Sequence, residues 1–126
     1  MIRKLIIALT ATAVLAFAMP LTAFADGDAA AGKSVFMANC MSCHGMTGKG
    51  DGPVGKALNP PPRDFSKGEF KFDADKNGEA GTDEDLAMVI KNGAGAYGGT
   101  PLMAPWPTLN DQQVSDLVAF IRSLKE

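Results

Sequence analysis

The sequence contains few of the residues that build most metal and redox sites. Its 126 residues include two cysteines, one histidine, one tyrosine and one tryptophan. A structural zinc site takes four Cys or His ligands, so the three available here would need a carboxylate as the fourth. A thioredoxin-like redox pair is expected near a βαβ pattern, and the sequence has no strand pattern. A plain disulfide between the two cysteines is another alternative in an oxidising compartment, but it would not explain the adjacent histidine.

The two cysteines and the histidine stand together in the motif Cys40-Met41-Ser42-Cys43-His44. This C-x-x-C-H order is the attachment signal of c-type haem. A two-residue spacer on a short helical turn lets both thiols reach the vinyl groups of one haem. The residue after the second cysteine then lies beside the iron, and His44 is the candidate proximal ligand, a common role for histidine. The motif therefore predicts one haem c attached through Cys40 and Cys43.

The first 25 residues have the features of a secretory signal peptide. A basic start at Arg3 and Lys4 precedes an uncharged apolar run, Leu5 to Ala18, that is too short to span a bilayer comfortably. Ala23-Phe24-Ala25 fits a cleavage site, so we expect export to the periplasm and one mature domain at residues 26–126. An uncleaved membrane anchor is the alternative, but we expect no stable membrane insertion.

The expected mature domain is acidic. Removing Arg3 and Lys4 from the 12 basic residues leaves 10, against 14 acidic residues. This balance argues against nucleic acid or an anionic membrane surface as a partner. The domain also has few large aromatic residues: Phe36, Phe65, Phe70, Phe72, Tyr97, Trp106 and Phe120. A haem would supply the missing apolar volume, so we expect the apo-protein to be poorly folded.

Three segments have helical patterns, which predicts an all-α fold of three main helices. They run from Asp28 to Cys40, from roughly Asp83 to Asn92 after a cap at Thr82, and from Asn110 onward. Glycine- and proline-rich loops separate them. Gly32 is expected where another helix approaches closely, and Leu117 and Phe120 of the last helix are candidates to meet it.

The sixth iron ligand must come from another residue type, because the chain has no second histidine. Met103 lies in an irregular loop with Pro101, Pro105 and Pro107, and these prolines lower the entropic cost of ordering the loop. The other methionines of the expected mature domain lie near the attachment motif or inside a helix. We expect Met103 to complete a His/Met pair, which raises the reduction potential.

Four further residues are candidates for haem contact. A carbonyl near Pro53 is a natural acceptor for the second ring N–H of His44. Arg63 offers a fork of donors to a haem propionate, or is a surface arginine. Tyr97 and Trp106 are expected to pack on the ring or bond a propionate, and either could be simple core.

The segment from Asp73 to Glu84 has the spacing of a twelve-residue EF-hand calcium loop. Its context is weaker: the preceding segment is not convincingly helical, position eight is only Ala80, and no second loop follows. Thr82 and the acidic residues 83–85 also suit the start of the next helix. An acidic surface loop is therefore the simpler interpretation, and calcium binding is the alternative.

The sequence resembles a bacterial class I cytochrome c with one haem, over essentially all of the mature chain. Besides the attachment motif, the resemblance rests on Gly32–Phe36, Gly52-Pro53, Pro62–Phe65, Leu102–Trp106 and Leu117–Ile121. It implies an all-α fold at residues 26–126 whose first and last helices cross. It also implies thioether bonds at Cys40 and Cys43, axial ligands His44 and Met103, and Pro53 as the carbonyl partner of His44.

With both axial positions filled, the iron has no open site for a substrate. We therefore expect a monomeric electron carrier, not an enzyme, that meets redox protein partners through small transient interfaces. A haem subunit docked permanently in a larger oxidoreductase is one alternative, which a large exposed apolar patch would indicate. A haem sensor or peroxidase-like protein is another, if Met103 does not bind the iron.

Overall fold

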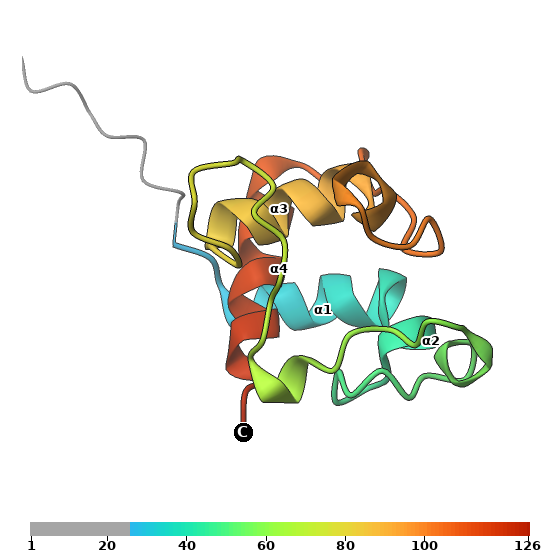
Figure 1. Ribbon diagram of the computed structural model, residues 1–126. Helices are drawn as coiled ribbons and strands as arrows, with labels where there is room; N and C mark the ends of the chain where they lie inside the picture. Colours follow the sequence, from blue (N-terminus) through green and yellow to red (C-terminus); the bar gives the residue numbers. More distant parts are fainter. Residues whose placement is uncertain (1–25) are drawn as a thin grey trace, which may run out of the picture.

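The structure, a computed structural model, describes residues 26–126, so the signal peptide predicted at residues 1–25 lies outside the described residues. The described chain is helical and contains no strand, as expected (Figure 1). Its α-helices are α1 (Ala29–Asn39), α2 (Met41–His44), α3 (Asp83–Asn92) and α4 (Asp111–Ser123). Three short 3-10 helices are η1 (Gly55–Ala57), η2 (Phe65–Lys67) and η3 (Ala94–Tyr97). In this part of the chain no helix combines the length and apolar character that crossing a membrane requires.

The first and last helices cross at close range, as predicted (Figure 1). A Cβ atom added to Gly32 of α1 would lie 1.9 Å from the carbonyl oxygen of Asp116 in α4. Beside this crossing the ring centroids of Phe36 and Phe120 are 5.1 Å apart, and Phe36 and Leu117 are both 0% exposed. The absence of a side chain at Gly32 therefore lets the two backbones meet and brings these apolar residues into one core.

Local capping fixes where the helices begin. The Asp28 carboxylate accepts hydrogen bonds from the N–H groups of Ala30 and Ala31, and the Asp28 N–H donates to the Asp116 carboxylate at 2.8 Å. The start of α1 is thereby tied to α4. At the other two main helices, Thr82 and Asn110 each form a reciprocal capping box with the residue three positions later.

Arg122 joins the segment before α3 to the last helix. Its guanidinium donates to the Asp83 carboxylate at 2.9 Å and to the carbonyl oxygen of Gly81 at 2.6 Å, and it lies 4.9 Å from the centroid of the Phe70 ring. These contacts hold the long connection between η2 and α3 against α4. The result is a frame in which α1, α3 and α4 fix the positions of two irregular segments, residues 45–72 and 93–109.

Candidate haem site

A cavity of about 770 Å³ lies between α2 with its following loop and the loop that follows α3. Cys40, Cys43 and His44 line it from one side, and Met103 and Trp106 line it from the second loop. Figure 1 shows α2 and this second loop, drawn in orange, at the same end of the molecule, with α2 below the loop. Much of the remaining lining is apolar, including Phe36, Phe65, Leu86, Val89, Ile90 and Leu117. The fold thus brings the attachment motif and Met103 to one apolar chamber.

The two cysteines lie on the short turn of helix formed by α2 and the residue before it. Both are half-buried and free, so no disulfide joins them. Burial, reinforced by the neighbouring Cys43, raises the pKa of the Cys40 thiol to about 11, so this thiol is protonated at neutral pH. The pair therefore presents two separate thiols at the cavity wall, as covalent attachment of one group through both requires.

His44 ends α2 and is held by its surroundings in one orientation. The side chain is buried, and its ring stacks on Phe65 with centroids 4.5 Å apart and an interplanar angle of 17°. Burial lowers the pKa of His44, which favours the neutral ring that binds metals. Its Nδ1 lies 3.3 Å from the carbonyl oxygen of Arg63, which leaves Nε2 as the ring nitrogen available to an iron.

The expected carbonyl partner of His44 differs in the structure, because Arg63 takes the place predicted for Pro53. Pro53 is exposed and is not among the residues that line the cavity. The loop around it folds back on α2, where Gly52 and Val54 donate their N–H groups to the carbonyls of Cys43 and Ser42. The chain after the proline run passes over the imidazole instead, and the Arg63 carbonyl therefore reaches Nδ1.

Met103 is half-buried on the second loop, which is fastened to the end of α3. The N–H of Ala94 donates to the Met103 carbonyl at 3.2 Å, and the N–H of Trp106 donates to the Ile90 carbonyl at 3.0 Å. Gly93, which ends α3, has φ +80°, and a Cβ there would lie 2.8 Å from the Met103 carbonyl oxygen. This crowded junction sets the position from which the thioether enters the cavity.

The remaining candidates divide into two groups. The structure places Arg63 and Trp106 in the cavity lining, and their contact with a haem stays a prediction. It does not bring Tyr97 there: the chain turns back at Gly98, and the Tyr97 hydroxyl accepts a hydrogen bond from Asn92 at 2.7 Å. Tyr97 therefore braces η3 against the end of α3, because a short 3-10 turn after the helix keeps the side chain local.

Phe65 and Asp85 are among the lining residues that were not predicted as part of the site. Phe65 stacks on His44, although its place in the sequence, after a proline run, gives no periodic pattern that would place it in the core. Asp85 lines the cavity and is 1% exposed, whereas the sequence assigned it only to the start of the next helix. The only local signal for Asp85 is its spacing of three residues from Thr82, which is that of a capping box.

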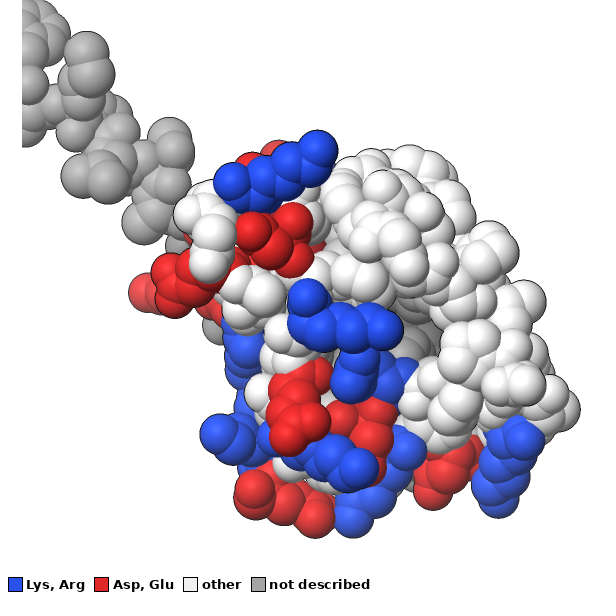
Figure 2. Space-filling view, viewed as in Figure 1, with Lys and Arg blue, Asp and Glu red and all other residues white. Residues whose placement is uncertain are grey.

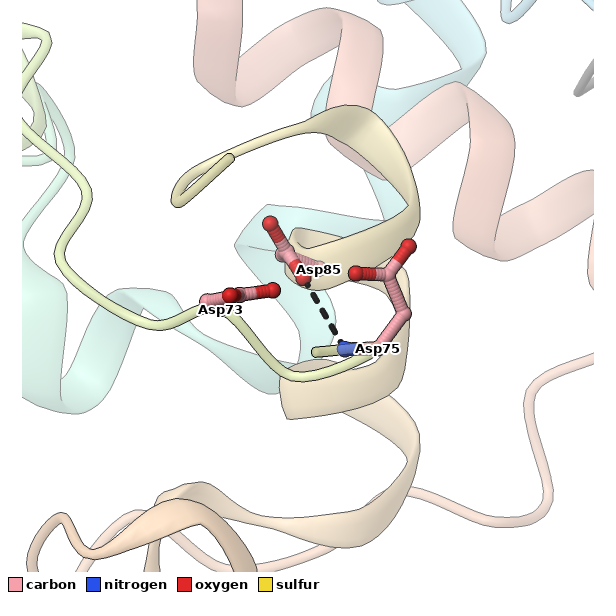
Figure 3. A group of neighbouring side chains, drawn as sticks. All are labelled: Asp73, Asp75 and Asp85. Atoms are coloured by element: carbon pink, nitrogen blue, oxygen red, sulfur yellow. Dashed lines mark hydrogen bonds between the residues drawn. The ribbon is translucent and has the colours of Figure 1, made fainter. Parts of the chain in front are cut away.

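The acidic loop assembles a different group from the one that its spacing predicted (Figure 3). Carboxylate oxygens of Asp73, Asp75 and Asp85 lie within 4.8 Å of one another. Glu84, the expected twelfth-position ligand, is exposed and lies outside this group. The Asp73 carboxylate accepts hydrogen bonds from the N–H groups of residues 77 and 78, and that of Asp85 from residues 74, 75 and 82. These hydrogen bonds give the loop its shape, and calcium binding stays a sequence-based prediction.

Comparison with known proteins identifies the class to which this fold and cavity belong. Residues 29–125 match the family model of cytochrome c, and the chain belongs to this family. Its likeness to particular members supports a class I cytochrome of the one-haem type. The chain is 35% identical to cytochrome c-554(547) of Halothiobacillus neapolitanus over 100 residues, which is 79% of this chain and 99% of that protein.

A solved structure is also similar. It is a chain of the reducing HAO-like protein complex of Kuenenia stuttgartiensis, with a TM-score of 0.65 and 32% sequence identity. The match covers 79% of the present chain but only 44% of that chain, so the present chain corresponds to less than half of its length.

Family membership implies a covalently bound haem c and a role in haem-based electron transfer. The chamber fits such a group: it is large, mostly apolar, bordered by two free thiols in C-x-x-C-H spacing, and has a neutral imidazole beside them. Cytochromes of this family are in general electron carriers and not enzymes.

Proposed function

We propose that the protein is a periplasmic electron carrier with one haem c, attached through Cys40 and Cys43, with His44 and Met103 as axial ligands. One observation carries the proposal: the cysteines and histidine of the attachment motif line the same apolar cavity as Met103, which lies on the loop after α3. The bound haem supplies an iron that changes oxidation state by one electron. With an imidazole and a thioether on it, the iron has no position left for a substrate.

In this proposal, separate segments of the chain orient His44, position Met103 and shield the haem from water. The Arg63 carbonyl and the Phe65 ring orient His44, so that its neutral Nε2 is offered to the metal. The junction at Gly93 positions the Met103 thioether. The apolar lining excludes water, and Arg63 supplies a cation near the cavity for a propionate.

The surface around the cavity suggests how partners are met. Figure 2 shows a hollowed face with charged side chains gathered on one side and an uncharged surface on the other. Residues 93–110 contain no Lys, Arg, Asp or Glu, and Leu102 in this segment is 50% exposed. A rim that is half apolar and half charged suits small, short-lived contacts between a monomeric carrier and redox proteins.

A second candidate is a haem subunit of a larger oxidoreductase. It is favoured by the likeness to a chain that belongs to a complex, although the match spans 44% of that chain. The size of the protein released from its native cells distinguishes the two functions: a carrier elutes as a single small species, whereas a subunit co-elutes with a larger assembly.

Optical spectra test the proposed ligands. The wild-type holoprotein is expected to be low-spin with a sulfur–iron charge-transfer band when oxidised, and Met103→Ala is expected to lose that band because no other thioether reaches the iron. Met46→Ala is the matched control, since Met46 is 68% exposed and its loss leaves the band intact. A high-spin wild type that binds carbon monoxide readily would overturn His/Met ligation and favour a sensor or peroxidase-like protein.

The junction between α3 and the methionine loop yields a second prediction. Gly93 and Gly98 have φ of +80° and +82°, but a Cβ at Gly98 would meet nothing within 4 Å. Gly98→Ala should therefore cost only the strain of its backbone, about 1 kcal/mol of unfolding free energy. Gly93→Ala should cost about 3 kcal/mol, because Gly93 has φ +80° and ψ 154°, a region nearly closed to other residues, and because the added methyl also collides with the Met103 carbonyl.

Urea unfolding of the two holoproteins, followed together with the charge-transfer band, checks this prediction. Gly93→Ala should also weaken the band, since the collision displaces the loop that carries Met103. Equal stability and equal bands in the two variants would show that the junction does not position the ligand.

A further inference from the structure

Asp85 differs from every other charged residue that lines the cavity. The charged residues that line the cavity are Arg63, Asp64, Lys67, Glu69, Lys71 and Asp85. The first five are half-buried or exposed, so water screens their charges. Asp85 is 1% exposed, and its carboxylate lies against the backbone of residues 74, 75 and 82 with almost no access to solvent. Water therefore screens this charge less than it screens the charges of the other five residues.

Neutral donors alone surround the Asp85 carboxylate. One oxygen accepts from the N–H groups of Ala74 at 2.6 Å and Asp75 at 3.2 Å, and the other accepts from the N–H and hydroxyl of Thr82, both at 2.9 Å. The ion pairs among residues 26–126 involve Asp83, Asp111 and Glu126 and not Asp85. No cation therefore cancels its charge at contact distance.

The charge persists at neutral pH. Burial alone would raise the pKa of Asp85, but the hydrogen bonds from Thr82, Asp75 and Ala74 outweigh it and lower the pKa below its ordinary value. The carboxylates of Asp73 and Asp75 lie close by, as Figure 3 shows, and they add negative potential of the same sign. The wall of the cavity formed by the start of α3 is therefore negative.

We infer that Asp85 tunes the redox centre, its buried negative charge favouring oxidised over reduced iron and so lowering the reduction potential. The inference rests on the proposed function, since it needs a haem iron in the cavity. The oxidised centre carries one more positive charge than the reduced one, and a fixed anion stabilises it more. Burial and local charge are among the factors by which a protein sets a haem potential.

The same residue also stabilises the fold, so the test must separate charge from structure. Asp85→Asn removes the charge and keeps the size, whereas Asp85→Glu keeps the charge and disturbs the hydrogen bonds. Glu84→Gln is the matched control: it makes the same change in formal charge one residue away, at an exposed side chain. The midpoint potential of each holoprotein is measured by optical redox titration at moderate ionic strength, with EDTA present so that no divalent ion neutralises the acidic group.

At a fixed applied potential, Asp85→Asn should shift the ratio of reduced to oxidised protein upward by roughly threefold to tenfold, where tenfold corresponds to about 59 mV for one electron. Asp85→Glu and Glu84→Gln should stay within about twofold of wild type, even where Asp85→Glu unfolds more easily. A potential that is unchanged in Asp85→Asn, or shifted equally in Asp85→Glu, would overturn the inference and leave Asp85 a purely structural residue.

If Asp85→Asn does not take up haem, Asp85→Ser replaces it, because a hydroxyl still accepts one hydrogen bond and adds no charge. Failure of both neutral variants to fold would also overturn the inference, since the hydrogen bonds would then account fully for Asp85. Failure of the proposed function appears elsewhere, in a wild-type spectrum without the sulfur–iron band, before any potential is compared.

Discussion

Gly32→Ala is expected to lower the unfolding free energy of the holoprotein by about 3 kcal/mol or more. The added methyl carbon would lie 1.9 Å from the Asp116 carbonyl oxygen and 2.4 Å from its carbon. Both atoms belong to the backbone of α4, so no side chain can rotate away to make room. The two helices would have to separate, and the packing of Phe36 on Phe120 would be lost with them.

The expected loss of stability is opposite in sign to the effect of an ordinary Gly→Ala substitution in a helix. At an uncrowded helical position, replacing glycine by alanine stabilises a protein by roughly 0.5–1 kcal/mol, because alanine has less backbone entropy to lose. Ser34→Ala, at an exposed position of the same helix, serves as the control and should change stability by no more than about 0.5 kcal/mol. Chemical denaturation followed by circular dichroism measures both. A Gly32→Ala protein as stable as wild type would contradict the close crossing.

The features that were predicted correctly from the sequence are those that depend on neighbouring residues. Thr82 and Asn110 lie three positions before side chains that complete their capping boxes, so the starts of α3 and α4 can be found by inspection. The glycine of α1 stands in a helical pattern where it has no local benefit, which indicated close packing. The attachment motif is likewise complete within five consecutive residues.

The contacts that were not predicted correctly from the sequence depend on how the loops between the helices fold. Both Pro53 and Arg63 lie in loops after His44, and only the folded path decides which carbonyl reaches the imidazole. Tyr97 and Trp106 are both aromatic residues that follow α3, yet only Trp106 lines the cavity, while Tyr97 is hydrogen-bonded to Asn92. Asp85 was unrecognised as a cavity residue because two of its hydrogen bonds come from residues ten and eleven positions earlier.

The largest effect is expected from removing the two attachment thiols together. Cys40→Ala/Cys43→Ala should retain no covalent haem and should lose cooperative unfolding, because several apolar residues that line the cavity of about 770 Å³ also belong to the hydrophobic core. Without haem, the apolar residues that line this cavity would face water, at a cost of about 25 cal/mol for each Å² of apolar surface left exposed. A typical domain is stable by only about 5–15 kcal/mol, so the loss should be severe.

Ser42→Ala is the matched control, since it lies between the two cysteines, is exposed and keeps both thiols. It should bind haem covalently and unfold cooperatively, as judged by haem staining of a denaturing gel and by near- and far-ultraviolet circular dichroism in urea. The double alanine variant should show neither the stain nor a sharp transition. If it unfolds as cooperatively as the control, the helix crossing at Gly32 suffices to hold the domain together, and the cavity is not the centre of its stability.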